Sequence, residues 1–151
     1  MKNENNSLEY VKKLINENNN EKALEILNHN SDKSIWAQNA RAVCLMRLNS
    51  PANAAKVLTP IIFKSGSIII NSEVPEKIKL NLVEAMLLIG NVAGAVNLIE
   101  NCQDDCPTRT KLKAAIKKWE KSLPIWSRFM IFLGILPFDK PITIEHPYGE
   151  L

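Results

Sequence analysis

Two cysteines, Cys102 and Cys106, have the spacing in this sequence that best suits a metal ion. A structural zinc site needs four thiolate or imidazole ligands, and two of them often lie two to four residues apart. The other candidate ligands, Cys44, His29 and His146, are scattered singly along the chain. Because the sequence has no second closely spaced pair, we expect no metal and interpret Cys102 and Cys106 as loop residues.

Residues suited to catalysis are sparse. Neither histidine lies beside a candidate nucleophile, and there is no glycine-rich phosphate loop. Glu84 stands in a predicted helix rich in leucine, valine and methionine, where burial would raise its pKa. Isolated buried acids are rare, so we favour a carboxylate that faces a groove and pairs with lysine or arginine. We therefore expect a binding protein with no enzymatic activity and no cofactor.

A basic patch is predicted on a helix near the C-terminal end of the chain. Its members recur every four residues, as expected for one helix face, and they are Arg109, Lys113, Lys117 and Lys121. The simplest interpretation is a solvated helix face. A phosphate-bearing partner, an acidic protein or an anionic membrane surface would also suit it. Nucleic acid is not an expected partner, because the net charge is only +3.

The helices that must position these residues show a pattern that occurs three times. Each copy has Asn or Gly where a helix breaks, alanine five positions later, and a large aliphatic residue four positions after that. The trios are Asn18–Ala23–Leu27, Asn49–Ala54–Leu58 and Gly90–Ala95–Ile99. Asn and Gly tolerate the left-handed conformation that ends a helix. Alanine suits the point where two helices of a hairpin cross, because a larger side chain would separate them.

The trios resemble tetratricopeptide repeats, which are helix–turn–helix units of about 34 residues. The resemblance covers about residues 5–102. It implies an all-α fold, a right-handed solenoid of about three helical hairpins. It also implies that the first helix of each hairpin lines a concave groove that binds extended peptides or helices. Beyond the resemblance, an apolar stripe bracketed by Pro107 and Pro124 predicts a C-terminal capping helix, and the residues after it predict an irregular apolar tail.

Transferred to this sequence, the resemblance assigns eight positions to the partner-binding groove. They are Lys12, Asn39, Val43, Arg47, Lys77, Leu80, Glu84 and Leu87. Some members of the family hold a peptide carboxylate with basic residues and asparagines. That arrangement is incomplete here, because the third hairpin has Leu80 and Glu84 at the corresponding positions.

The predicted organisation has three parts. Residues 1–7 form a polar, flexible N-terminus, and Ser7 is a suitable N-cap for the first helix. Residues 8–122 form the repeat domain with its capping helix, and residues 123–151 form the tail. Within the domain, residues 68–70 are β-branched. They are expected to form either a short strand or an extension of the flanking helices.

The tail is expected to pack on the domain. Its docking residues are predicted to be Trp126, Phe129, Phe132 and Phe138. Since apolar surfaces in one chain should associate, residues 125–138 are expected in the groove of their own chain or of a second copy. Residues 142–145 alternate like a strand and would pair with residues 68–70.

These patterns predict a cytoplasmic protein-interaction module, an adaptor or scaffold. The N-terminal residues have no apolar core of the kind that an export signal requires, so reduced thiols are expected. The partner is another protein of unknown identity, and the tail could produce a homodimer. The alternative is a membrane-peripheral accessory protein, attached through the basic helix and the apolar tail.

Overall fold

The computed structural model describes residues 2–30, 32–64, 67–103, 106–132, 142–144 and 148–151, without the side chains of residues 2–6 and 129–132. Within these residues the fold is all-helical. The helices are α1 (Lys2–Asn16), α2 (Asn20–His29), α3 (Ile35–Arg47), α4 (Pro51–Ile62), α5 (Glu76–Leu88), α6 (Val92–Glu100), α7 (Pro107–Ser122) and α8 (Ile125–Phe132).

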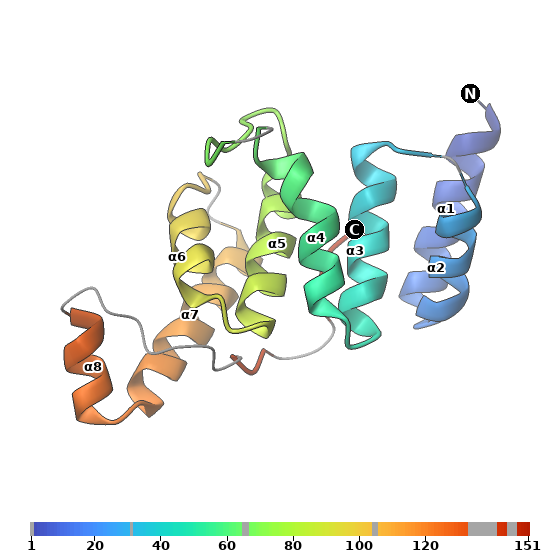
Figure 1. The fold of residues 1–151 in the computed structure, drawn as a ribbon. Coiled ribbons are helices and arrows are strands. Elements are labelled where there is room, and N and C mark those ends of the chain that lie inside the picture. Colours follow the sequence, from blue (N-terminus) through green and yellow to red (C-terminus); the bar gives the residue numbers. More distant parts are fainter. Residues whose placement is uncertain (1, 31, 65–66, 104–105, 133–141, 145–147) are drawn as a thin grey trace.

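The first seven helices pack in chain order. Each of them contacts the next, and α1, α3, α5 and α7 also contact one another in succession. The molecule is therefore a row of helices that runs from α1 and α2 at one end to α7 and α8 at the other (Figure 1). The odd-numbered helices form one continuous layer in this row.

Three helices end in the same way, at the three predicted breaks. Asn18, Asn49 and Gly90 all have positive φ, of 60°, 57° and 83°. In each case the following residue donates its N–H to the carbonyl five positions earlier, as in Asn19 N to Leu14 O at 2.8 Å. This is the Schellman motif, which satisfies the last carbonyls of a helix. The predicted left-handed breaks are confirmed.

The alanine of each trio is fully buried. Ala23, Ala54 and Ala95 are each 0% exposed, and the aliphatic residues that follow them are buried as well. A larger side chain at any of these alanines would have no free volume to occupy. Their complete burial agrees with the prediction that they lie where two helices of a hairpin cross.

The N-terminal prediction is wrong in one respect. Helix α1 begins at Lys2, so Ser7 lies inside the helix instead of capping it. The Ser7 hydroxyl accepts a hydrogen bond from Asn30 Nδ2 at 3.1 Å. The side chain that suits an N-cap is thus used to join α1 to the end of α2.

The described residues between α4 and α5, which are 63–64 and 67–75, form neither a strand nor a helical extension. Helix α4 ends at Ile62, and one isolated antiparallel bridge joins Phe63 to Ile70. The predicted pairing of residues 142–145 with residues 68–70 is wrong for residues 142–144, and residue 145 lies outside the described residues. Ile142 donates its N–H to Leu87 O at 3.0 Å instead. The β-branched residues favour extended backbone, but the described residues of this segment form only the one isolated bridge and no strand.

Helix α5 is the centre of the core. Every residue from Ile78 to Leu87 is buried, so the helix is covered on all sides. Three of those residues are polar or charged, namely Lys79, Asn81 and Glu84. Buried polar groups need partners. Lys79 forms an ion pair with Glu76 at 2.8 Å, and the other two contact the end of the chain.

Candidate functional site

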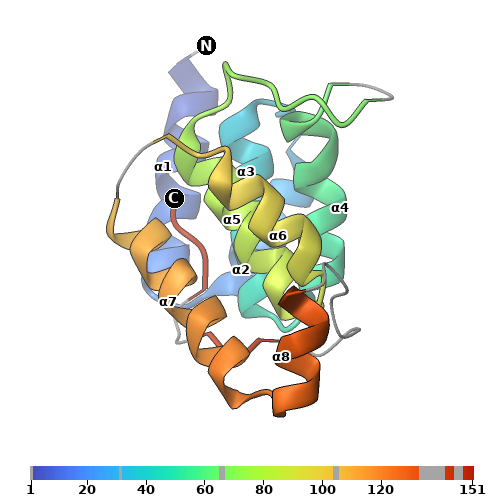
Figure 2. The same ribbon diagram turned by 90° about the vertical axis from the view of Figure 1, so that its left-hand side faces the viewer.

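The last four described residues, 148–151, lie against the odd-numbered layer, and we call them the docked segment. They run alongside α5 and in the opposite direction (Figure 2). Gly149 contacts Glu84, Glu150 contacts Asn81, and Leu151 contacts Lys77. We call the surface that holds them the α3/α5 face. Its members are Asn39, Val43, Arg47, Lys77, Asn81 and Glu84.

Spacing within the two helices explains why these residues converge. On α3 the residues are 39, 43 and 47, and on α5 they are 77, 81 and 84. Residues three or four apart lie on one side of an α-helix. Because α3 and α5 pack side by side, their two rows of side chains meet the same stretch of main chain.

Two asparagines hold the Glu150 peptide units. Asn39 Nδ2 donates to Glu150 O at 3.0 Å, and Asn81 Nδ2 donates to the same oxygen at 2.7 Å. Asn81 Oδ1 accepts the Glu150 N–H at 2.9 Å. Asn81 Nδ2 also donates to Asn39 Oδ1 at 2.7 Å, which fixes both amides. The two asparagines therefore satisfy both the N–H donor and the carbonyl acceptor of Glu150.

Charged groups hold the residues on either side. Arg47 donates to Tyr148 O at 2.8 Å, to Gly149 O at 3.3 Å and to Ile15 O at 2.8 Å, so it also joins α1 to this surface. Lys77 Nζ donates to Leu151 O at 2.7 Å and lies 4.9 Å from the centre of the Trp36 ring. The guanidinium fork is well suited to several carbonyl acceptors at once.

Glu84 is the one carboxylate of the α3/α5 face. Its Oε2 accepts the Gly149 N–H at 2.9 Å, and the residue is 5% exposed. Burial raises the pKa of the Glu84 carboxyl above its ordinary value. The Gly149 N–H and the positive Lys111 and Arg47 oppose that shift. Burial also lowers the pKa of the Arg47 guanidinium. The α3/α5 face is therefore polar but shielded from water.

Of the eight predicted groove residues, five lie on the α3/α5 face. They are Asn39, Val43, Arg47, Lys77 and Glu84. Leu87 contributes its carbonyl to Ile142, just before the docked segment. Lys12 forms an ion pair with Glu9 at 2.7 Å, and Leu80 is buried at 1% exposure.

Sequence reasoning missed Asn81, Met46 and Thr108. Asn81 lies one residue beyond the assigned Leu80, and its distance from Lys77 and Glu84 shows that it shares their helix face. A polar residue within an apolar helix was the available signal. Met46 lies against Gly149, and Thr108 donates a hydrogen bond to the Glu150 carboxylate. Nothing in their spacing indicates these roles.

Of the four tail residues predicted to dock, only Trp126 has a described side chain, and it does not lie on the α3/α5 face. Trp126 is 70% exposed and Ile125 is 84% exposed on α8. The side chains of Phe129 and Phe132, and the whole of Phe138, lie outside the described residues. The prediction that residues 125–138 occupy the groove is wrong for Ile125 and Trp126. The docked segment takes that place, because its main chain satisfies buried polar groups that apolar side chains would leave without partners.

The basic residues of α7 have varied surroundings. Lys113 forms an ion pair with Glu100 at 3.0 Å, and Arg109 donates to Ile99 O at 3.3 Å. Lys117 and Lys121 are exposed. Two of the four predicted residues therefore have partners within the chain and two are exposed, and their action as one basic surface stays a prediction. A hollow of about 490 Å³ lies on a different face of α7, between that helix and residues 142–144.

The cysteines are free thiols in three separate surroundings. Cys44 and Cys102 are buried, and burial raises their pKa values to about 11 and about 12. Cys106 is half-buried at the start of α7. Among the residues that the structure describes, no three potential metal ligands are clustered.

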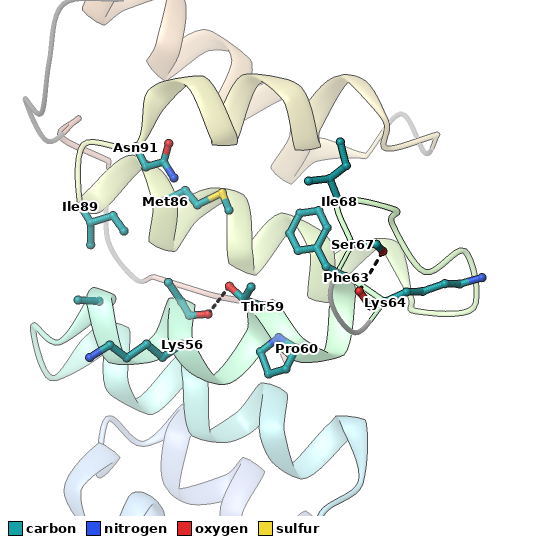
Figure 3. A pocket seen from close by; sticks show the side chains of 12 residues that line it. Lys56, Thr59, Pro60, Phe63, Lys64, Ser67, Ile68, Met86, Ile89 and Asn91 are labelled. Atoms are coloured by element: carbon teal, nitrogen blue, oxygen red, sulfur yellow. Dashed lines mark hydrogen bonds between the residues drawn. The ribbon is translucent and has the colours of Figure 1, made fainter.

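A second hollow lies on the other side of the molecule, over α4. It measures about 920 Å³ and is bounded by α4, the end of α5, the turn before α6 and the loop after Phe63. Met86, Phe63 and Ile68 line it, with Lys56 and Lys64 at its edge (Figure 3). Its lining is largely apolar, whereas the α3/α5 face is lined by polar groups that already have partners.

Comparisons with protein-family models, with curated proteins and with solved structures found no match to this chain. None of the helices in the described part of the chain has both the length and the apolar character needed to cross a bilayer. The contacts of the α3/α5 face are therefore the structural feature that indicates a function most directly.

Proposed function

We propose that the chain is a protein-interaction module whose α3/α5 face binds an extended peptide segment of a partner protein. The observation that supports this proposal is the docked segment itself. Its main chain from Tyr148 to Leu151 is held by side chains of α3 and α5, namely Asn39, Arg47, Lys77, Asn81 and Glu84. Main-chain hydrogen bonds are how proteins bind extended peptides of varied sequence.

The proposal includes a finer description of the fold. We infer a right-handed solenoid of about three hairpins similar to tetratricopeptide repeats, with α7 as its cap. The chain-order packing of α1 to α7 and the three Schellman motifs support this inference. In such an arrangement the first helices of the hairpins, α1, α3 and α5, line the concave side, where the docked segment lies.

The chain's own segment would then compete with the partner. A segment attached to the same chain has an effective concentration of about a millimolar when its linker is short and flexible. A partner must therefore displace residues 148–151, and the free chain is held in an autoinhibited state. Exchange of the segment between two copies would give a homodimer through the same contacts.

A fluorescent peptide with the sequence of residues 142–151 tests the proposal. Fluorescence anisotropy should show that it binds a chain ending at residue 147 at least about tenfold more tightly than the full chain. Asn39→Ala with Asn81→Ala should abolish binding, whereas Asn97→Ala on the exposed side of α6 should not change it. The proposal fails if the shortened chain keeps its helical circular dichroism but does not bind the peptide.

A second candidate function has one observation in its favour. Ile125 and Trp126 are 84% and 70% exposed, and Arg128 joins α8 to the end of α7 through Lys121 O. Exposed lysines of α7 lie near this apolar pair. Basic and aromatic residues together suit an anionic membrane surface. Flotation with anionic vesicles at low and high salt tests attachment, and Trp126→Ser should abolish it. Protein that stays at the bottom of the gradient at low salt excludes this function.

A further inference from the structure

Gly149 is the residue of the docked segment that the α3/α5 face surrounds most closely. It is buried, and its φ is +71°, in the left-handed region that residues with a side chain rarely adopt. Its neighbour Glu150 is exposed, and Tyr148 and Leu151 are half-buried. Gly149, the second of the four residues, is therefore the position of the docked segment with the least room for a side chain.

Space alone excludes a side chain at this position. A Cβ atom built on Gly149 would lie 2.8 Å from Val43 Cγ2 and 2.8 Å from Met46 Cε. Val43 and Met46 are each 0% exposed, so both are packed on every side. The valine is β-branched and has little rotational freedom on a helix. Met46 could bend away more easily, but Val43 could not.

The main chain at Gly149 cannot move aside without losing hydrogen bonds. Its N–H donates to Glu84 Oε2 at 2.9 Å, and its carbonyl accepts from Arg47 at 3.3 Å. The next N–H, that of Glu150, donates to Asn81 Oδ1 at 2.9 Å. A shift that relieved a Cβ clash would break this series and leave buried polar groups without partners.

We propose that the α3/α5 face selects partner peptides that have glycine at one fixed position. Resting on the proposed function, this inference names the class of peptide: an extended segment with glycine at the position of Gly149, followed by a residue whose main chain pairs with Asn39 and Asn81. Tyr148 and Leu151 add the packing of half-buried side chains on the core, and Glu150 adds a hydrogen bond from Thr108, but glycine is the residue whose replacement the face leaves no room for. The docked segment is the one example of this class that the structure shows.

The first test uses the full chain and hydrogen exchange of residues 142–151. Gly149→Ala and Gly149→Val should remove the protection of the Gly149 and Glu150 amides and increase their exchange about tenfold or more. Thr143→Ala, at an exposed position of the same tail, should exchange like the wild-type chain. Circular dichroism confirms that the helices are unchanged. Wild-type protection in Gly149→Ala would overturn the inference.

The second test adds peptides to the full-length Gly149→Val chain, whose own segment should be displaced. A peptide with the sequence of residues 142–151 should bind about tenfold more tightly than the same peptide with alanine in place of glycine. A peptide with alanine at the threonine position should bind like the first. Equal binding of the glycine and alanine peptides overturns the glycine inference alone. Failure of every peptide to bind, with the segment displaced, overturns the proposed function and this inference with it.

Discussion

The docked segment and helix α8 both belong to the tail that follows α7, but they lie in opposite surroundings. The docked segment contains a glycine and a glutamate, and its main chain is enclosed between α3 and α5. Helix α8 has the sequence IWSRFMIF, and its first two side chains are 84% and 70% exposed. The docked segment, which is the more polar part of the tail, is thus bound to the helices. Helix α8, which is the more apolar part, begins with two exposed side chains.

The difference follows from what the α3/α5 face offers. Asn39, Asn81 and Glu84 are polar groups at 5% exposure or less. An apolar helix laid over them would leave each one without a partner, at about 1–3 kcal/mol each. An extended main chain provides both donors and acceptors at the right spacing. Hydrophobic association has no direction, so it cannot compensate for mismatched hydrogen bonds at this surface.

Asn81→Ala should lower the stability of the chain and the docking of residues 148–151 more than the other substitutions below. The change removes both hydrogen bonds to Glu150 and the one to Asn39, and it leaves buried partners unsatisfied. We expect the free energy of unfolding to fall by about 3 kcal/mol and residues 148–151 to become accessible. Urea unfolding measures the loss. Asn97→Ala, on an exposed part of α6, should stay within about 0.5 kcal/mol of wild type. A similar small change for Asn81→Ala would show that the segment is not held by its main chain.

Arg47→Lys should have the next largest effect. Lysine keeps the charge but cannot bond to Tyr148, Gly149 and Ile15 in the fork geometry of arginine. We expect a loss of about 1–2 kcal/mol and faster hydrogen exchange at residues 148–151. The matched control is Arg41→Lys, because Arg41 also donates three hydrogen bonds, all of them away from the tail. If both variants exchange alike at residues 148–151, Arg47 does not hold the segment.

The pH dependence of stability in Glu84→Gln and in the wild-type chain tests the role of the Glu84 carboxyl. Burial raises the pKa of Glu84 above its ordinary 4.5, so the folded chain holds this proton more tightly than the unfolded chain does. The contribution of Glu84 to stability is therefore present in full below pH 4.5 and is lost as pH rises through the raised pKa. Relative to Glu84→Gln, the wild-type chain should lose stability over that range. Denaturant unfolding at a series of pH values measures this, and parallel curves for the two proteins would contradict it.

Ile125→Ser on α8 should have the smallest effect. Because Ile125 is 84% exposed, the free energy of unfolding should change by less than about 0.5 kcal/mol. The same substitution at Ile142, which is 2% exposed and joined to α5, should cost about 2 kcal/mol or more. Thermal melts of the two variants compare them directly. A larger loss for Ile125→Ser would mean that α8 is more deeply packed than its exposure indicates.

The hairpin breaks could be predicted from the sequence because their cause is local. Asn18, Asn49 and Gly90 are among the few residue types that accept a positive φ, and alanine at a fixed distance indicates close packing. The resemblance assigns five residues of the α3/α5 face, once the three breaks align the hairpins. Asn81 was missed by one position, because Leu80 and Asn81 both have helical spacing from Lys77 and Glu84 and only the polar side chain distinguishes Asn81.

The docked segment could not be predicted, for a physical reason. Its hydrogen bonds are made mainly by main-chain groups, which every residue has, so they leave no periodic pattern in the sequence. Hydrophobicity pointed to Trp126 and its neighbours, because apolar burial is the usual force that attaches a tail. Only Gly149 has a residue type that the site requires, and a single glycine in a polar stretch more commonly indicates a turn.

The distance along the chain between the docked segment and its partners has a consequence for folding kinetics. Asn39 and Glu150 are separated by 111 residues, and Arg47 and Tyr148 by 101, whereas the hairpin contacts are between neighbouring helices. Contacts between distant residues form late, because the closure of a long loop costs entropy before any bond is made. During synthesis the hairpins up to α6 therefore assemble while the α3/α5 face is still uncovered. In that interval a segment of another chain can bind there without competition from residues 148–151.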